Sequence, residues 1–296
     1  MWSPNSILPE TANLVSFYPL FYLRNLLYLV IYAAGIFDYC MDRQIHFDVC
    51  VGVSAGGANI ASYIAGQRGR NYQFYTEYAF RKQYMGLGNF LRKHSYIDLD
   101  YVYGTLSNAG GENPLDYKAM LQNPAELVVA CNALTGEAKY FDKGDVGPDR
   151  FDIMKASCAI PFVCHPYEVA GVPYYDGALG DPIPVEKAFQ MGCDKVVVIL
   201  TRPKDELRAP GKDPFFANRI VKKYPLAAKK LRERAGRYNE GVAAAKEYEA
   251  QGRALIVAPD DICGLKTLSK DKDALERFYQ KGLRDAQAIP AFISEH

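Results

Sequence analysis

The sequence lacks both a marked net charge and any paired-cysteine motif. Its 35 lysines and arginines nearly balance 34 aspartates and glutamates, which leaves a formal net charge of +1. A chain this close to neutral offers no basic footprint for nucleic acid and no polybasic anchor for anionic lipid. The seven cysteines are an odd number, scattered and without a CxxC pair. They predict buried thiols in a reducing, cytoplasmic compartment, without disulfide bonds or zinc.

The sequence also lacks an uninterrupted apolar run long enough to cross a bilayer. Residues 1–37 are unusually apolar, but Pro19, Arg24 and Asn25 interrupt them. About a dozen clean residues remain, against the ~20 that a membrane-spanning helix needs. The stretch has neither the positively charged start nor the clear cleavage site of a signal peptide. A buried strand leading into a helix is the favoured interpretation, and a membrane-surface anchor is the alternative.

Neither a GxGxxG fingerprint nor a GK[ST] loop is present, so the glycine-rich stretch at residues 47–66 is not typical of a phosphate-binding loop. An apolar, β-branched run at 47–53 predicts a buried strand, and small apolar residues at 58–65 predict a helix that ends at Gly66. Between them the chain carries one GxSxG motif, Gly52-Val53-Ser54-Ala55-Gly56. A strand, GxSxG and a helix together are the setting of a nucleophile elbow.

This setting gives Ser54 chemical reasons to be a nucleophile. The turn is tight, so a side chain at Gly52 or Gly56 is expected to clash where strand and helix approach each other. The helix N-terminus that follows favours negative charge at the serine. The backbone N–H groups of Ala55 and Gly56 are the expected donors to a developing oxyanion.

A serine nucleophile needs a base, and histidine is scarce in this chain. Only His165 and His296 lie far enough downstream for the order serine, acid, histidine; the others are His46 and His94. His296 is the last residue, and His165 has no orienting acid beside it, so a Ser-His-Asp triad is poorly supplied. A cysteine hydrolase built from Cys158 or Cys164 with His165 is disfavoured. Cys164 and His165 are adjacent and would point apart in an extended segment.

Asp176 is the best placed alternative base. It follows a short predicted strand at residues 172–175 and precedes Gly177 and Ala178. A carboxylate held against the serine hydroxyl could take its proton directly. The Asp-Gly dipeptide is equally typical of a plain turn. The spacing alone leaves both interpretations open.

Strands alternate with helices through about residue 201, which predicts an α/β fold with a mostly parallel central sheet covered on both faces. Beyond residue 215 the chain is helix-rich and charged, with one apolar run at 254–258. We therefore predict an α/β domain over residues 1–201 and a helix-rich C-terminal extension over 202–296 that packs on it. The other predicted helices are 71–84, one ending before Pro161 and one before Gly192; the other predicted strands are 125–134, 137–141, two around a turn at Ala170-Gly171, and 195–201.

At its two motifs the chain resembles the patatin-like phospholipases, and more narrowly their bacterial members. The resemblance covers roughly residues 32–296 and leaves residues 1–31 divergent. It is carried by G-V-S-A-G at 52–56, S-Y-I-A-G-Q-R-G-R-N-Y at 62–72, D-G-A at 176–178, D-P-I-P-V-E at 181–186, G-C-D-K at 192–195, T-R-P-K at 201–204 and R-Y-N at 237–239.

The resemblance implies a three-layer α/β fold and a Ser–Asp dyad without histidine. Ser54 would attack an ester carbonyl, and Asp176 would take its proton and later activate water. The substrate would be a phospholipid, a lysophospholipid or another acyl ester, met during transient association with a membrane surface, with no metal and no cofactor. The acidic pairs Asp98/Asp100 and Asp260/Asp261 would then be solvated caps and not metal ligands.

The chain departs from the family in one element. Members carry a glycine-rich loop after the first strand that supplies oxyanion N–H groups, and here it should fall near residues 25–30, which read N-L-L-Y-L-V. Bulky residues do not readily adopt the positive-φ turns of such a loop. Either the N-terminus has been replaced or part of the oxyanion hole has been lost. The second case predicts a weak enzyme or a lipid-binding relative without turnover; acyl transfer or thioester hydrolysis by the same dyad is a further alternative.

Overall fold

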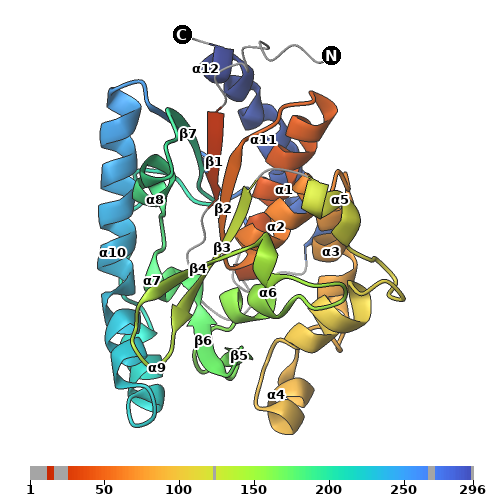
Figure 1. Ribbon diagram of the computed structural model, residues 1–296, viewed down its shortest axis with the longest axis vertical. Helices are drawn as coiled ribbons and strands as arrows, with labels where there is room; N and C mark the ends of the chain where they lie inside the picture. The colour runs from red at the N-terminus through yellow and green to blue at the C-terminus, as the bar shows by residue number, and fades with distance from the viewer. Residues whose placement is uncertain (1–11, 17–25, 123–124, 266–270, 295–296) are drawn as a thin grey trace, which may run out of the picture.

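The computed structural model describes residues 12–16, 26–122, 125–265 and 271–294. In these ranges an eight-stranded sheet lies between helices on both faces (Figure 1). The strands are β1 (Ala12–Ser16), β2 (Val49–Val53), β3 (Ala125–Asn132), β4 (Ala138–Asp142), β5 (Tyr167–Val169), β6 (Val172–Asp176), β7 (Lys195–Ile199) and β8 (Ala254–Val257). The helices are α1 (Leu26–Asp42), α2 (Ala55–Ile64), α3 (Arg70–Thr76), α4 (Leu87–Lys93), α5 (Tyr117–Gln122), α6 (Asp152–Ser157), α7 (Gly177–Gly180), α8 (Val185–Gln190), α9 (Asp213–Ile220), α10 (Pro225–Ala250), α11 (Lys272–Asp285) and α12 (Ile289–Ser294).

The sheet is mostly parallel, as the alternation of strands and helices predicted. Its order is β5-β6-β3-β2-β1-β7-β8, with β4 paired to β3. The pairs β3–β2, β2–β1, β1–β7 and β7–β8 are parallel, whereas β4, β5 and β6 form the antiparallel part. Ser54 follows the parallel strand β2, and Asp176 ends the antiparallel strand β6. Both strands are neighbours of β3, so the two residues lie at the ends of strands on either side of it.

Both faces of the central strands are buried, which explains their nearly continuous apolar sequences. On β2, Cys50 belongs to the core beneath α1, α2 and α11, while Val51 and Val53 belong to the core beneath α8 and α10. On β7, Val197 and Val198 divide between the same two cores. Successive side chains of a strand point to opposite faces, so these short runs supply both layers of the sandwich.

The described residues of the apolar N-terminal stretch form a strand followed by a helix, as the favoured interpretation predicted. Strand β1 lies between β2 and β7 in the sheet. Helix α1 is buried from Tyr28 to Phe37, where it packs against α2, α3 and α11. This part of the apolar run is covered by protein and is therefore not a free anchor. Within the described ranges, no helix is both long and apolar enough to cross a bilayer.

The C-terminal region packs on the sheet and also extends it. Strand β8 pairs in parallel with β7, and α11 lies along α1 on one face while α10 covers the other (Figure 1). The helices α1 and α11 touch through glycines. A Cβ at Gly282 would lie 2.1 Å from the Tyr32 carbonyl oxygen, and one at Gly35 would lie 2.3 Å from the Tyr279 carbonyl oxygen.

Two predicted helices differ from the structure. The helix predicted over residues 71–84 is helical only in α3 and in a single 3-10 turn, Tyr78–Phe80. Its aromatic side chains pack into the core, with the Phe74 and Tyr78 rings edge to face at 5.0 Å, and this tertiary packing prevails over local propensity. The helix predicted from residue 58 begins earlier, at Ala55, directly after the GxSxG serine.

Candidate active site

The turn between β2 and α2 places Ser54 between a buried strand and a helix N-terminus. Ser54 has φ 55° and ψ −133°, a conformation that non-glycine residues rarely adopt. Gly52 makes this turn sterically possible, because a Cβ there would lie 2.4 Å from the Cα of Gly57. A strained backbone held by close packing is a common way to present a reactive side chain.

Asp176 lies directly against the serine. Ser54 Oγ donates a hydrogen bond of 2.7 Å to Asp176 Oδ2, although 122 residues separate the two in the chain. Asp176 ends β6, which runs beside β3, and its backbone N–H donates to the Ala159 carbonyl oxygen at 2.9 Å. The neighbouring Gly177 packs against β3 so closely that a Cβ would lie 2.1 Å from the Val129 carbonyl oxygen. The sheet therefore fixes the position of the carboxylate.

The environment of Asp176 raises the pKa of its carboxyl towards neutral pH. The side chain is fully buried, and this desolvation raises its pKa from the ordinary 3.8 to about 6. Hydrogen bonds from the Ser54 hydroxyl and, at 2.9 Å, from the Ala178 N–H to Oδ1 act in the opposite direction. The positive charges of Arg234 and Arg208 also lower the pKa. The result is a carboxylate that is ionised at pH 7 but basic enough to accept a proton.

A second serine positions the backbone of the first. Ser157 Oγ accepts a 2.8 Å hydrogen bond from the Ser54 N–H and donates one of 2.6 Å to the Val129 carbonyl oxygen. The Ser54 N–H is thus already used. The N–H groups of Ala55 and Gly56 open the first turn of α2, where helical geometry provides no intrahelical acceptor.

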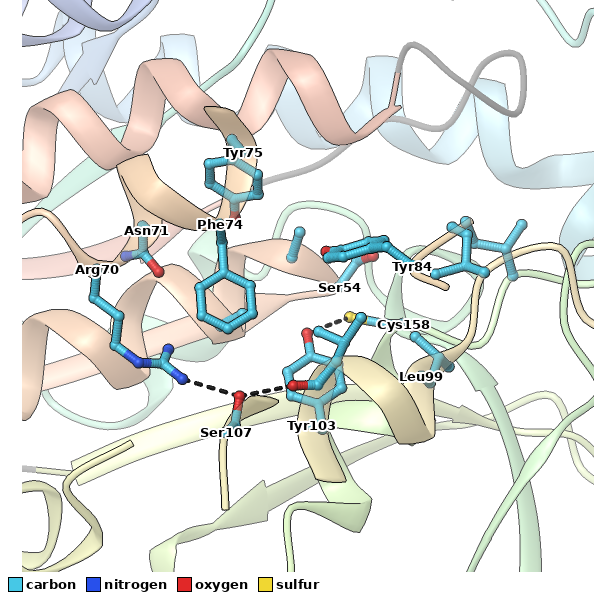
Figure 2. A pocket seen from close by; sticks show the side chains of 15 residues that line it. Ser54, Arg70, Asn71, Phe74, Tyr75, Tyr84, Leu99, Tyr103, Ser107 and Cys158 are labelled. Carbon is cyan, nitrogen blue, oxygen red and sulfur yellow. Dashed lines mark hydrogen bonds between the residues drawn. The ribbon is translucent and has the colours of Figure 1, made fainter. Parts of the chain in front are cut away.

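A partly enclosed cavity lies beside Ser54. Its walls come from α2, α3, the segment 84–107 and the loop after α6 (Figure 2). Most of the lining is apolar or aromatic, with a polar group at one end formed by Arg70, Asn71 and Ser107. In Figure 2 that polar end lies on one side of Ser54, and Leu99 and Tyr84 lie on the other.

The family model described as patatin-like phospholipase matches residues 29–189, which is more than half of the 296-residue chain. The chain belongs to the patatin-like phospholipase family. This is a family of lipid acyl hydrolases, so the fold and the resemblance seen in the sequence agree. A second family model, a domain of unknown function (DUF6363), matches residues 224–294 of the patatin-like chain.

One curated protein and one solved structure are similar to the patatin-like chain. The uncharacterized protein YjjU of Escherichia coli (strain K12) is 29% identical over 194 residues, which are 61% of this chain and 51% of that protein. The chain thus spans about half the length of this relative. The crystal structure of VipD from Legionella pneumophila is similar with a TM-score of 0.47 and 12% identity, covering 95% of this chain and 67% of that one.

Among the described residues, the patatin-like site contains none of the histidine or cysteine pairings considered from the sequence; His296 lies outside those residues. His165 Nδ1 lies 2.8 Å from Ser95 Oγ, in a different cavity from Ser54. Burial raises the pKa of the Cys158 and Cys164 thiols to about 12, so neither is readily a thiolate. None of the seven cysteines, all of which lie in the described ranges, forms a disulfide; six are buried, and Cys263 is half-exposed.

The acidic pairs lie outside the cavity beside Ser54, and one member differs from its prediction. Asp98 is buried, not solvated, and pairs with Lys93 at 2.5 Å while accepting the Tyr101 N–H. Asp100 pairs with Lys155 at 2.9 Å. The exposed Asp260 and Asp261 both face Lys281.

The expected position of the glycine-rich loop also shifts. Residues 26–30, where it was expected, form the first turns of α1, so the connection between β1 and α1 is residues 17–25, which lie outside the described residues. Their sequence, F-Y-P-L-F-Y-L-R-N, contains no glycine.

Neither Ser157 nor Arg70 was predicted from the sequence as a residue of the site. Ser157 acts through contacts to residues 103 and 28 positions away, which leave no local pattern. Arg70 belongs to the quoted S-Y-I-A-G-Q-R-G-R-N-Y stretch but has no spacing that marks it. The only signal was its place in that stretch.

Proposed function

We propose that this protein is a serine lipid acyl hydrolase of the phospholipase or lysophospholipase type, with Ser54 as nucleophile and Asp176 as general base. The observation that carries the proposal is the 2.7 Å hydrogen bond between Ser54 Oγ and Asp176 Oδ2 at the edge of a mostly apolar cavity. Membership of a lipid acyl hydrolase family supports the same reaction class.

In the proposed reaction, Ser54 Oγ attacks the ester carbonyl carbon while its proton passes to Asp176 Oδ2. The N–H groups of Ala55 and Gly56 face the forming oxyanion at the start of α2, where the helix dipole favours negative charge. The alcohol leaves with the proton held by Asp176, and an acyl-serine remains. Water then gives a proton to Asp176 and attacks the acyl carbon, and the proton returns to Ser54 as the fatty acid leaves.

One sequence observation favours a weaker catalyst as a second candidate. The segment between β1 and α1 contains no glycine, and removal of one oxyanion donor typically costs about a hundredfold to a thousandfold in turnover. A chain impaired in this way would bind lipid with little hydrolysis. The same dyad also serves acyl transfer or thioester hydrolysis, which product analysis with a competing alcohol separates from ester hydrolysis.

The substrate is proposed to be taken from a lipid surface during transient association, in the cytoplasm. Large apolar side chains are exposed on α4 and α9, with Leu91 at 78% and Phe215 at 48%. The two helices approach each other through Phe162, whose ring lies 6.1 Å from Phe90 and 6.0 Å from Phe215. Exposed apolar groups near one end of the molecule support such contact.

Hydrolysis of a long-chain monoacyl ester by the wild type and Ser54→Ala tests the function. The proposal predicts release of fatty acid by the wild type and loss of at least about a thousandfold in Ser54→Ala, with an unchanged circular dichroism spectrum. Ser294→Ala, an exposed serine on α12, is the matched control and should retain full activity. Equal turnover by Ser54→Ala would contradict the proposal. Vesicle binding without fatty acid release would favour the lipid-binding candidate.

A further inference from the structure

Arg70 is a buried cation without a carboxylate partner among the described residues. The residue is 91% buried, since only 9% of its surface is exposed. Its Nη1 donates to Ser62 Oγ at 2.9 Å, and its Nη2 donates to Ser107 Oγ at 2.9 Å and to the Asn113 carbonyl oxygen at 3.0 Å. All three acceptors are neutral, and Nε has no acceptor in the described part of the chain.

Arg234, a second buried arginine, has the carboxylate partner that Arg70 lacks within the described ranges. Arg234 Nε donates to Asp213 Oδ2 at 2.9 Å, and its Nη2 also contacts that carboxylate, so its charge is balanced inside the protein. Buried charges are normally paired in this way because desolvation is costly. Burial lowers the pKa of Arg70 only to about 10, so the guanidinium stays charged at pH 7.

The Arg70 guanidinium lies 4.7 Å from the centre of the Phe74 ring, a cation–π contact that does not neutralise its charge. Arg70 lines the same cavity as the serine. Ser54, Ala55 and Ala58 form one wall along α2, and their small side chains leave space along the helix. Arg70 reaches Ser62 on the same helix, eight residues after Ser54. With a rise of 1.5 Å per residue, the guanidinium therefore lies roughly 12 Å along α2 from the serine.

The other polar groups at this end are already occupied. Asn71 Nδ2 donates to the Asn59 carbonyl oxygen and its Oδ1 accepts from Ser62. Ser107 Oγ donates to the Val102 carbonyl oxygen while it accepts from Arg70 (Figure 2). Among the described residues, the unused hydrogen-bonding group at this end of the cavity is therefore a donor, Arg70 Nε, and it belongs to a positively charged side chain. Only an anionic ligand group satisfies both.

We propose that Arg70 forms an anion subsite that binds the phosphate of an acyl glycerophosphate substrate while its ester lies at Ser54. This inference rests on the proposed function. An extended glycerol backbone, with bonds near 1.5 Å, separates the ester carbonyl from phosphorus by roughly 7 Å. A contact of about 3 Å to Ser54 at one end and to Arg70 at the other brings the total length close to the roughly 12 Å that separates the two side chains along α2. Guanidinium is suited to phosphate because its planar fork offers several parallel donors.

Binding to Ser54→Ala tests the subsite independently of turnover. Titration calorimetry would compare dodecyl phosphate with dodecanol, which share a chain and differ in the anion. We expect at least tenfold tighter binding of the phosphate, and loss of that difference in Ser54→Ala/Arg70→Gln. Inorganic phosphate is the third ligand: binding at least a hundredfold weaker than dodecyl phosphate assigns the subsite to a substrate group. Equal binding of dodecyl phosphate and dodecanol, or of inorganic and dodecyl phosphate, would overturn the proposal.

Hydrolysis provides the second arm. For 1-lauroylglycerol 3-phosphate and 1-lauroylglycerol, Arg70→Gln should lower the ratio of the two kcat/KM values at least tenfold. Arg68→Gln is the matched control, since Arg68 pairs with Asp42 at the surface, and it should leave the ratio unchanged. If Arg70→Gln does not fold, the binding comparison in Ser54→Ala still decides, because it needs no change at Arg70. An unchanged ratio overturns the subsite alone; preferential binding without hydrolysis of either ester overturns the proposed function alone.

Discussion

At the scale of single residues, the carboxyl of Asp176 carries an energetic conflict. Burial opposes its ionisation, while the proposed chemistry needs it ionised and basic. Its folded-state pKa of about 6 lies above the ordinary 3.8. Between these two values the unfolded chain has released its proton and the folded chain has not, so the folded state loses stability as pH rises through this window.

Asp176→Asn is therefore expected to stabilise the protein at high pH. The difference of about two pKa units corresponds to roughly 2–3 kcal/mol in the free energy of unfolding at pH 8, and the gain should vanish near pH 3.5. Urea denaturation at both pH values measures it. Asp194→Asn, at an exposed position, should change stability by less than about 0.5 kcal/mol. A gain that is equal at both pH values would rule out ionisation as its cause.

Ser157 is a positioning residue at the same scale. It joins the Ser54 N–H to the Val129 carbonyl oxygen, so it fixes the turn that presents the proposed nucleophile. Ser157→Ala should lower kcat about tenfold, leave KM nearly unchanged and reduce the free energy of unfolding by about 1–3 kcal/mol, because a buried N–H and a buried carbonyl lose a partner. Steady-state kinetics and denaturation check the two parts. A rise in KM with unchanged kcat would show that Ser157 affects binding and not the nucleophile.

At the scale of elements, the β2–α2 turn depends on the absence of one side chain. Gly52→Ala places a Cβ 2.4 Å from the Gly57 Cα, where backbone and not a flexible side chain must move. We expect a loss of at least about 3 kcal/mol or failure to fold. Gly236→Ala is the matched control: it lies in α10 with no heavy atom within 4 Å of its Cβ position, and it should gain up to about 1 kcal/mol. Thermal unfolding of both variants gives the comparison, and a stable Gly52→Ala would refute the packing argument.

Element types were largely predictable from the sequence, whereas their extents and contacts were not. The apolar runs that became β2, β3 and β7 are short and contain β-branched residues, so run length and composition identified them. The prediction of one continuous helix over residues 71–84 was wrong, because elements that are distant in the sequence decide the burial of Phe74 and Tyr78. Ser54 and Asp176 were selected by motif and resemblance. The short distance between their side chains could not be predicted, because it depends on β2 and β6 both lying next to β3 in the sheet. The Arg70 subsite depends on which carboxylates are not nearby, and no local pattern carries that information.

At the scale of the whole molecule, the two predicted regions share one core. Tyr32 of α1 stacks on Phe278 of α11 at 5.1 Å and donates to Asp285 at 2.8 Å. Asp38 accepts a 2.7 Å hydrogen bond from Tyr279. The four-residue strand β8 pairs with the edge of β7 that β1 does not occupy. The C-terminal region therefore completes the α/β sandwich and covers its longest apolar helix.

A chain of residues 1–201 is expected not to fold, because it would expose α1 and the edge of β7. It should lack cooperative thermal unfolding and should bind a hydrophobic dye that the full chain does not bind. The full chain, measured in parallel, is the control. Recovery of a cooperatively folded 1–201 fragment would show that the extension is a separate unit.

The proposed mechanism depends on Asp176 acting as the base for Ser54. The most direct measurement is the rate at which a fluorophosphonate probe labels the chain between pH 4.5 and 8.5, with the labelled residue identified by mass spectrometry. We predict labelling at Ser54, with a rate that rises through about pH 6 as the Asp176 carboxyl ionises, and labelling of Asp176→Asn at least about a hundredfold slower at pH 8. Labelling of Asp176→Asn at the wild-type rate, or modification of another residue in place of Ser54, would contradict it.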